Sequence, residues 1–401
     1  MKILIATIGS RGDVQPYLNL AQGLLAAGHD VQLASNPTLG ELAGAHGIPF
    51  HPVGHPVDMG AAGARLLEQS FGNMWIGLIR VMQLAARLVQ EAYPEVLAAC
   101  RDADLVITTD TGSGVAEAQK LGKRWISVTL QPARLPTVQD HLPSPIGRAT
   151  GCLLGKVLIG PTNRFRKSVG APLVKDIGSM LSERMILLPV SPCVAPFNPG
   201  WVKQVRQTGY WFARAVADWE PLPDLVNFLQ AGARPIAVSL GVMSTSGRRA
   251  QDSARIVLEA IRKTNTRAIL QGWDRGLLME MGAPRSVYCA SSLPHSWLFD
   301  QVAAVIHHGG FGTTAAGLRS GVPSVVIPHI IDQFAWGQAV FALGVGPKFI
   351  PRGRLTSENL AQAITQALSD STMRAKADQV GAAIRAEPDG VEAAVRLIGT
   401  V

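Results

Sequence analysis

The stretch that decides the fold is "VIHHGGFGTTAAGLRSGVPSVVIPHIIDQFAWG", residues 305–337. It begins with a short β-rich apolar run, which leads into a glycine loop and then into a helical pattern. After a further glycine and a proline, the same order of strand, loop and helix starts again. A strand–helix–strand unit of this kind predicts neighbouring parallel strands in a doubly wound α/β sheet.

Outward from this stretch, the same rhythm fills both halves of the 401-residue chain. We predict strands at "KILIAT", "DVQLA", "IPFHPV" (an edge strand), "DLVITT" and "WISVTL" in the first half, and at "PIAVSL", "RAILQG" and "AAVIHH" in the second. Residues 189–223 are crowded with proline and aromatic residues and hold no sustained period, and they indicate a last strand of the first domain followed by a linker. We therefore expect an N-terminal α/β domain over 1–205, a linker over 206–223 and a similar C-terminal domain over 224–401.

The composition bounds the class of protein. Hydrophobic residues make up 47% and charged residues 16% of the chain, which excludes a disordered protein. No apolar run reaches the roughly 18 to 20 residues that a membrane span needs. The N-terminal stretch "MKILIATIGSRGD" turns polar too soon for a secretory signal, so we expect a cytoplasmic location.

The charge and the cysteines narrow the set of partners. The net charge of +8 favours anionic partners such as phosphorylated metabolites. No basic stripe with interleaved aromatic residues is present, so we expect no nucleic acid partner. The four cysteines lie far apart and form no CxxC pair, which argues against a zinc site and a disulfide framework.

The glycine loop within 305–337 has the chemistry of a phosphate site. Its glycines, Gly309, Gly310 and Gly312, would let backbone amides approach a ligand closely. Thr313 adds a hydroxyl near a helix N-terminus, and His308 adds a ring donor. The lysine of a P-loop is missing, so the loop is not of that type.

Two further polar pairs lie in the same stretch. Asp332 and Gln333 offer a carboxylate and an amide, a pair suited to grip vicinal hydroxyls such as those of a sugar. His307 and His308 are adjacent, but neighbours in a strand point to opposite faces. We therefore expect no metal site at this histidine pair.

The N-terminal loop "ATIGSRGDVQP", residues 6–16, is not a dinucleotide fingerprint. Its glycines have the spacing GxxG, and no acidic residue ends the second strand, which argues against a nicotinamide or flavin cofactor. Asp13 precedes the helix that we expect to start near Pro16. It could cap that helix or act as a general base at a strand tip, and the neighbouring Arg11 and Gly12, which a cap does not need, favour the second role.

These motifs resemble those of the GT-B glycosyltransferases of family 1, which move a sugar from a nucleotide diphosphate to an acceptor. "TIGSRGDVQPYLNLAQGL", "GYWF" and residues 307–337 look most like sterol 3-β-glucosyltransferases, and next like glycopeptide glycosyltransferases of antibiotic-producing bacteria. The resemblance spans nearly the whole chain. It implies two Rossmann-like domains facing across a cleft, a last helix that packs back on the N-terminal domain, and inversion of the anomeric centre without a metal or other cofactor.

The resemblance also implies roles for individual residues. Asp13 matches the carboxylate regarded as the general base, in a loop that lies against the donor. Asp332 and Gln333 match the pair that holds the hexose hydroxyls. The residues matched to donor binding are, in full, Ser10, Arg11, Gly12, Gly241, His295, His308, Gly309, Gly310, Phe311, Gly312, Thr313, Asp332 and Gln333.

Three positions depart from the family pattern. In "SLGVMS", Val242 stands where serine is common, so a contact there would come from the backbone or from Ser244. Phe311 stands where alanine or serine is usual. Ser292 lies near the place of the tryptophan that stacks on uracil in plant relatives, which leaves both uridine and thymidine diphosphate donors open.

We therefore expect a transferase that moves a hexose, with glucose favoured, to a hydrophobic hydroxylated acceptor such as a sterol, terpenoid or polyketide. The segments 55–100 and 131–170, the second expected to be a long irregular loop, would line the acceptor pocket. Two alternatives are a nucleotide-sugar 2-epimerase of similar architecture and a non-catalytic module that binds a nucleotide sugar or a lipid. The apolar stretch 75–90 would permit weak peripheral membrane contact, although we favour a helix buried in the first domain.

Overall fold

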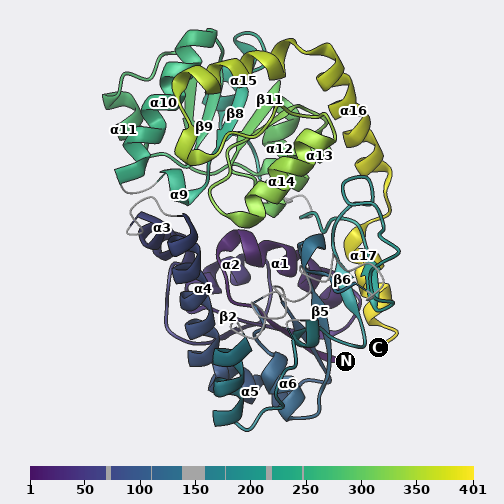
Figure 1. Cartoon of the computed structure of the whole chain (residues 1–401). Coiled ribbons are helices and arrows are strands. Elements are labelled where there is room, and N and C mark those ends of the chain that lie inside the picture. The colour runs from purple at the N-terminus through teal and green to yellow at the C-terminus, as the bar shows by residue number, and fades with distance from the viewer. Residues whose placement is uncertain (69–73, 110, 138–158, 177, 214–218, 246–247) are drawn as a thin grey trace, which may run out of the picture. The chain divides into compact units, whose positions relative to one another are not determined.

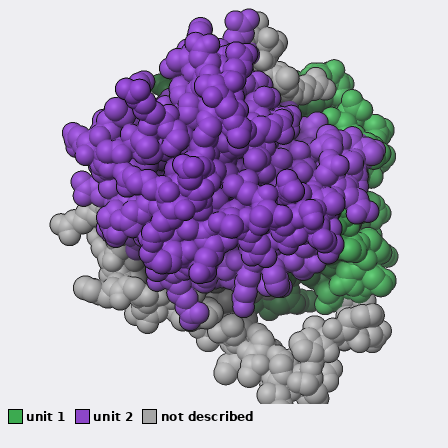
Figure 2. All heavy atoms as spheres, turned by 90° about the horizontal axis from the view of Figure 1, so that it is seen from above, with its two compact units in different colours: residues 1–59, 79–212, 388–401 green, residues 60–78, 213–387 purple. Residues whose placement is uncertain are grey.

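A computed structural model gives the structure of most of the chain, which forms two compact units (Figures 1 and 2). Unit 1 comprises residues 1–59, 79–212 and 388–401, and unit 2 comprises residues 60–78 and 213–387. The last residues of the chain thus belong to unit 1. The described residues are 1–68, 74–109, 111–137, 159–176, 178–213, 219–245 and 248–401.

Unit 1 is built on a seven-stranded sheet in which all strands are parallel, in the order β3-β2-β1-β4-β5-β6-β7. Its strands are β1 (Lys2–Ala6), β2 (Asp30–Ser35), β3 (Phe50–Pro52), β4 (Leu105–Thr108), β5 (Arg124–Val128), β6 (Ile186–Leu188) and β7 (Val205–Gln207). Its helices are α1 (Arg11–Ala26), α2 (Gly40–Ala45), α4 (Met74–Glu91, whose first turn falls in unit 2), α5 (Tyr93–Asp102), α6 (Val115–Lys120) and α17 (Gly390–Ile398), and residues 159–168 are also helical.

The start of α1 is set by a side chain that lies inside its first turn. Asp13 Oδ2 accepts hydrogen bonds from Ser10 N–H and Ser10 Oγ–H, both at 2.8 Å. This capping box lets the helix begin at Arg11. The expectation of a start near Pro16 was therefore wrong, and Asp13 lies within the helix.

The last helix of unit 1 packs closely on α1. A Cβ added at Gly23 of α1 would lie 2.3 Å from Val391 Cγ1, and one added at Gly390 would lie 2.5 Å from the carbonyl oxygen of Tyr210. Only glycine permits both approaches. The two glycines thus bring the end of the chain against the first helix, within one unit.

Unit 2 is built on a five-stranded sheet, also all parallel, in the order β10-β9-β8-β11-β12 (Figure 1). Its strands are β8 (Ile236–Ser239), β9 (Ala268–Gln271), β10 (Val287–Ala290), β11 (Ala304–His307) and β12 (Ser324–Val326). Its helices are α3 (Met59–Glu68), α8 (Pro223–Gln230), α9 (Val242–Thr245), α10 (Arg248–Thr264), α11 (Arg275–Glu280), α12 (His295–Leu298), α13 (Phe311–Ser320), α14 (Ile331–Ala342), α15 (Ser357–Ser369) and α16 (Ser371–Ala386).

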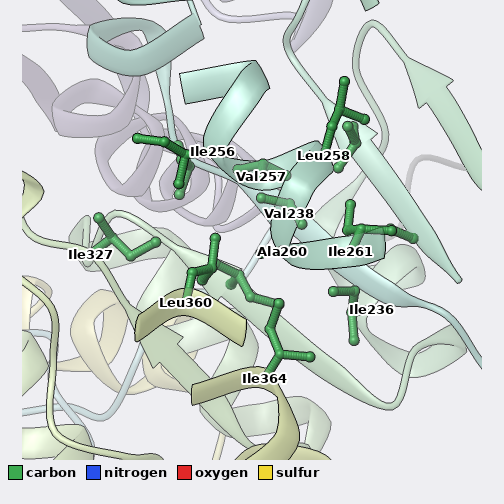
Figure 3. Close-up of a cluster of buried hydrophobic side chains, with 14 of the residues drawn as sticks. Ile236, Val238, Ile256, Val257, Leu258, Ala260, Ile261, Ile327, Leu360 and Ile364 are labelled. Atoms are coloured by element: carbon green, nitrogen blue, oxygen red, sulfur yellow. The ribbon is translucent and has the colours of Figure 1, made fainter. Parts of the chain in front are cut away.

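The core of unit 2 follows the alternation of side chains along its strands. Ile236 and Val238 of β8 belong to a buried cluster that α10 and α15 cover, which Figure 3 shows. Ala237, between them, belongs to a second cluster on the opposite face, with Leu225 of α8 and Phe299. Strands buried on both faces are typical of parallel sheets covered by helices on each side.

The predicted fold class is confirmed, because both sheets are parallel and helices connect their strands. "IPFHPV" supplies the edge strand β3, as expected. The last strand expected within 189–223 is β7, and the structure adds two strands that the pattern did not predict, β6 and β10. The first is only three residues long, and the second is only half-buried over most of its length.

Two further expectations in unit 1 were wrong. Residues 159–168 form a helix where we expected irregular loop, and its Phe165 packs edge-on against Tyr93 at a ring distance of 5.4 Å. On α4, Leu88 is buried, but Ile79 and Met82 are 53% and 50% exposed, so this helix is not buried throughout. Residues 138–158, which we expected to line the acceptor pocket, lie outside the described residues.

Candidate functional site

Each sheet reverses its strand order once, and many of the predicted site residues follow strands at these two points. In unit 1 the reversal lies between β1 and β4, and in unit 2 between β8 and β11. In open α/β sheets, ligands bind at the carboxyl ends of the strands at such a switch point. Ser10 and Asp13 follow β1, while Gly241 follows β8 and the glycine turn follows β11.

The glycine turn of unit 2 has a backbone shape that only glycine adopts without strain. Gly309 has a φ of +86°, and a Cβ there would lie 2.9 Å from both Val326 Cγ1 and the carbonyl oxygen of Gln333. Its N–H donates to His307 Nδ1 at 3.1 Å. The turn is thus held by a hydrogen bond to a buried imidazole and packs closely against the start of α14.

Beyond this turn lies the N-terminal end of α13. The helix begins at Phe311 after Gly310, and its first bond runs from Thr314 N–H to the carbonyl of Gly310 at 2.9 Å. The amides of the first three residues therefore have no partner within the helix. A Cβ added at Gly312 would meet nothing within 4 Å, so the first turn is open. The N-terminal end of a helix is suited to bind an anion, and α13 is a full helix of ten residues.

His308 lies between two glycines. A Cβ added at Gly241, whose φ is +71°, would lie 3.2 Å from its Nδ1, and a Cβ added at Gly310 would lie 2.4 Å from its Nε2. Nδ1 is 3.4 Å from the carbonyl oxygen of Ser239. Because a carbonyl only accepts, Nδ1 carries the proton in this contact. Nε2 can then donate to a ligand only when the ring is protonated on both nitrogens.

Asp332 and Gln333 lie in the first turn of α14. Gln333 is buried, and its Oε1 accepts hydrogen bonds from the N–H groups of His329 at 2.8 Å and Ile330 at 3.4 Å. The side-chain oxygen of Gln333 thus caps its own helix, which leaves the Nε2 group as the part of the amide available for a ligand. The ring of Phe311 packs on Trp336 of the same helix at 5.7 Å, so it connects α13 with α14.

His295 begins α12, which follows β10. Its ring stacks on Phe299 at 4.6 Å, and its Nε2 lies 3.5 Å from Gln271 Nε2 at the end of β9. The structure therefore places His295 near the carboxyl ends of the strands of unit 2, on the side of the sheet away from β12.

In unit 1 the predicted residues have a different character. Ser10 is partly exposed, and Arg11, Gly12 and Asp13 are exposed. Both bonds that Asp13 accepts fall on Oδ2, so Oδ1 accepts none from the described residues. Asp13 therefore serves as a cap and still offers one carboxylate oxygen to a ligand.

Two buried imidazoles of unit 2 are kept neutral. Burial, together with the charges of His308 and His295, lowers the pKa of His307 to about 3. Burial and the charges of His308, Arg352 and Arg249 likewise lower the pKa of His329 to about 3, although a hydrogen bond with the backbone of Ile327 acts the other way. Neither ring is available as a general base at neutral pH in its folded surroundings.

The sequence reasoning missed the role of His329 and Arg352 and misjudged Ser244. Ser244 is fully buried, and its hydroxyl is bonded to both of the other two side chains, so it is not free to contact a ligand. The available signal was the position of His329, directly after the strand run "SVVIP" and beside the glycine turn.

Metal ligands and membrane spans were searched for in the part of the chain that the structure describes. There, no three histidine, cysteine or acidic side chains gather closely enough to hold a metal ion. None of the helices described combines the length and the apolar character that crossing a bilayer requires.

Two family models match the chain. Residues 3–110 match the glycosyltransferase family 28 N-terminal domain, and residues 257–399 match the C-terminal domain of the erythromycin biosynthesis protein CIII-like family. Sterol 3-beta-glucosyltransferase of Emericella nidulans is 32% identical over 99% of the chain, and that of Debaryomyces hansenii 30% identical over 98%. The chain spans 30% and 26% of the length of these two relatives.

Solved structures show the same fold. The glycosyltransferase of kitacinnamycin has a TM-score of 0.75 at 21% identity, covering 100% of this chain and 98% of its own. SnogD from Streptomyces nogalater has a TM-score of 0.73 at 24% identity over 100% and 99%. SsfS6 of Streptomyces sp. SF2575, in complex with thymidine diphosphate, has a TM-score of 0.67 at 21% identity over 100% of both chains.

These findings confirm the predicted resemblance to two-domain glycosyltransferases and to sterol 3-β-glucosyltransferases. The chain has the GT-B fold, and it matches a glycosyltransferase family 28 N-terminal domain and an erythromycin biosynthesis protein CIII-like C-terminal domain.

Proposed function

We propose that this protein is an inverting glycosyltransferase that moves a hexose from a uridine or thymidine diphosphate sugar to a hydroxyl of a hydrophobic acceptor, without a metal. The observation that carries the proposal is the open first turn of α13, which lies at the switch point of unit 2 beside His308. It supplies a seat for a diphosphate in a chain that carries both glycosyltransferase domain matches.

The proposed chemistry needs stabilisation of the leaving group. As the bond to the anomeric carbon breaks, negative charge gathers on the departing diphosphate. The amides of Phe311, Gly312 and Thr313 and the N-terminal end of the helix dipole are aimed at such a charge without needing to reorganise. His308 adds a charged donor when both of its nitrogens carry protons. These groups do the work that a divalent cation does in other transferases.

The sugar and the acceptor use the remaining predicted residues. Asp332 and the Nε2 group of Gln333 bind hexose hydroxyls. Asp13 takes the proton from the acceptor hydroxyl as it attacks, through the Oδ1 atom that the capping box leaves available. The proton moves to Asp13, the new bond forms on the opposite face of the sugar, and the diphosphate leaves, which inverts the anomeric centre.

The class of acceptor follows from the relatives. Sterol 3-beta-glucosyltransferases match nearly the whole chain, and the structures of similar fold include the kitacinnamycin, calicheamicin and spinosyn glycosyltransferases. We therefore expect a bulky, largely apolar acceptor such as a sterol, terpenoid or polyketide, with glucose the favoured sugar.

The test is a mass-spectrometric screen of uridine and thymidine diphosphate sugars against aglycones of these classes. The expected result is a product heavier than one aglycone by one hexose residue, formed by the wild-type protein. The product should be lost in Asp13→Asn, whose amide keeps the size of the carboxylate but cannot take the proton from the acceptor hydroxyl. Isomerised donor in the absence of acceptor would identify an epimerase instead, and donor binding without turnover of any acceptor would identify a binding module.

A further inference from the structure

A continuous chain of hydrogen bonds runs from Arg352 to Gln333 through two buried side chains. Arg352, in the short 3-10 helix Arg352–Arg354, donates from Nε to Ser244 Oγ at 3.2 Å. Ser244 Oγ lies 2.5 Å from His329 Nε2. The backbone N–H of His329 then donates to Gln333 Oε1 at 2.8 Å.

The direction of each bond in this chain is fixed by chemistry. A guanidinium only donates, so Ser244 Oγ accepts from Arg352. The hydroxyl hydrogen of Ser244 is then available for His329 Nε2, which accepts it. A proton on His329 Nε2 would leave that hydroxyl hydrogen without an acceptor, so the chain requires the neutral ring. The positive charge of Arg352 near the ring favours the same state.

The chain is anchored at its far end on the core of unit 2. Arg352 Nη2 donates to Ser253 Oγ at 2.9 Å, and Ser253 Oγ donates to the carbonyl oxygen of Arg249 at 2.6 Å. Both residues belong to α10, which covers the central buried cluster (Figure 3). The planar fork of one arginine therefore connects this helix with α9, the short helix that follows β8.

At its near end, the chain holds the loop between β12 and α14. The ring of His329 is bonded to Ser244, and the backbone of His329 is bonded to Gln333. The side chain of Gln333 is thus oriented by a backbone whose position depends on Ser244. Asp332 precedes Gln333 in the same helical turn, so a shift of this loop moves both residues.

We propose that Arg352, Ser244 and His329 are positioning residues that set the sugar-binding end of the donor site, although none of them touches the donor. The inference rests on the proposed function, because that function assigns Asp332 and Gln333 to the hexose. The turn at the diphosphate seat has a hydrogen bond of its own, from Gly309 N–H to His307 Nδ1, which does not involve the chain. Loss of the chain should therefore weaken recognition of the sugar and spare recognition of the nucleoside diphosphate.

The test uses Ser244→Ala and Arg352→Gln, with Arg354→Gln as the matched control. Arg354 lies in the same 3-10 helix, but its side chain is exposed and lies outside the chain of bonds. Titration calorimetry first shows which of UDP and TDP the wild-type protein binds more tightly. It then measures the affinity of each variant for that diphosphate and for the corresponding diphosphoglucose. Hydrogen exchange of the His329 and Ile330 amides, without any ligand, is measured in parallel.

In both variants we expect the affinity for the diphosphoglucose to fall about tenfold, as for loss of a buried hydrogen-bond partner, while that for the diphosphate changes less than about twofold. The two amides should exchange faster than in Arg354→Gln. The affinity of the double variant for the diphosphoglucose should be no lower than that of the more impaired single variant, because both changes break one chain.

Equal losses for the diphosphate and the diphosphoglucose, or amide exchange no faster than in the control, would overturn the inference. If the wild-type protein bound neither nucleotide, the proposed function would fail by itself. The exchange measurement would still decide whether Arg352 and Ser244 hold the backbone at His329.

Discussion

Two loops lie at equivalent points of the two parallel sheets, where the strand order reverses. One follows β1 in unit 1 and the other follows β11 in unit 2, and their chemistry is opposite. The loop of unit 1 leads into the exposed residues 11–13 at the start of α1 and is stabilised by the carboxylate of Asp13. The loop of unit 2 is stabilised by the neutral, buried ring of His307 and presents backbone amides. One topology therefore offers a proton acceptor in one unit and hydrogen-bond donors in the other.

The buried ionisable groups repeat this contrast. In unit 1, burial raises the pKa of Glu117 on α6 to about 7, although backbone amides and Arg166 act the other way. In unit 2, burial lowers the pKa of His307 and His329 to about 3. Each group is pushed toward its neutral form, but the acid then gains a proton on folding and the bases lose one. Acidification should therefore affect the two units in opposite directions.

The largest expected effect comes from the exposed carboxylate of unit 1. Asp13→Ala should lower the transfer rate by about 10² to 10⁴-fold, the usual contribution of a general base. Donor affinity, measured by titration with the nucleotide, should change little. A variant that folds normally and keeps full transfer activity would remove Asp13 from its proposed role.

The corresponding change in unit 2 is His308→Ala. It should lower the transfer rate by about 10² to 10³-fold, as for other groups that stabilise developing negative charge, and it should also weaken binding of the nucleoside diphosphate. Full transfer activity in a variant that folds normally would contradict the proposed role of this ring.

The turn itself is probed by Gly309→Ala. A side chain at a φ of +86° is strained, and here its Cβ would also lie 2.9 Å from a backbone oxygen, so we expect a loss of about 1 to 3 kcal/mol in the stability of unit 2. Gly312→Ala, where the same atom meets nothing within 4 Å, is the control. Thermal unfolding of the two variants compares them directly, and equal midpoints would contradict the close fit at Gly309.

The pH contrast between the units gives a smaller effect. The histidines bind protons below a pKa of about 6.5 when unfolded, but only near pH 3 when folded. The free energy of unfolding is therefore undiminished above about pH 6.5 and falls as the pH is lowered. At about pH 5.5, each of His307 and His329 should lower the free energy of unfolding of unit 2 by about 1.4 kcal/mol. Glu117 acts the other way, since its folded pKa lies above its unfolded one. Its destabilising effect grows as the pH rises from about 4.5 to 7.

Calorimetric unfolding at about pH 8 and pH 5.5 measures both trends. Glu117→Gln, which keeps the shape of the neutral acid, should raise the stability of unit 1 more at the higher pH than at the lower. If the variant raised stability equally at both, the titration of Glu117 would have no part in it.

Some features of the fold and of the candidate site could be predicted from the sequence, and others could not. The β-rich runs and the glycines of 305–337 predicted the parallel sheets and the turn, because periodicity and glycine are local signals. The sequence placed Asp13 in the loop before the helix, whereas it lies within the helix, because the bond from Ser10 that starts the helix depends on side-chain geometry. The chain from Arg352 to Gln333 was not predicted, because its residues are 108 and 85 positions apart from Ser244 and only the fold brings them together.

The central claim is that a diphosphate binds at the first turn of α13. A crystal structure of the protein with UDP or TDP, at a concentration that saturates binding in solution, tests it directly. Phosphate oxygens should lie within hydrogen-bond distance of the amides of Gly312 and Thr313 and beside His308. A nucleotide bound elsewhere, with the first turn of α13 left unliganded, would contradict the claim.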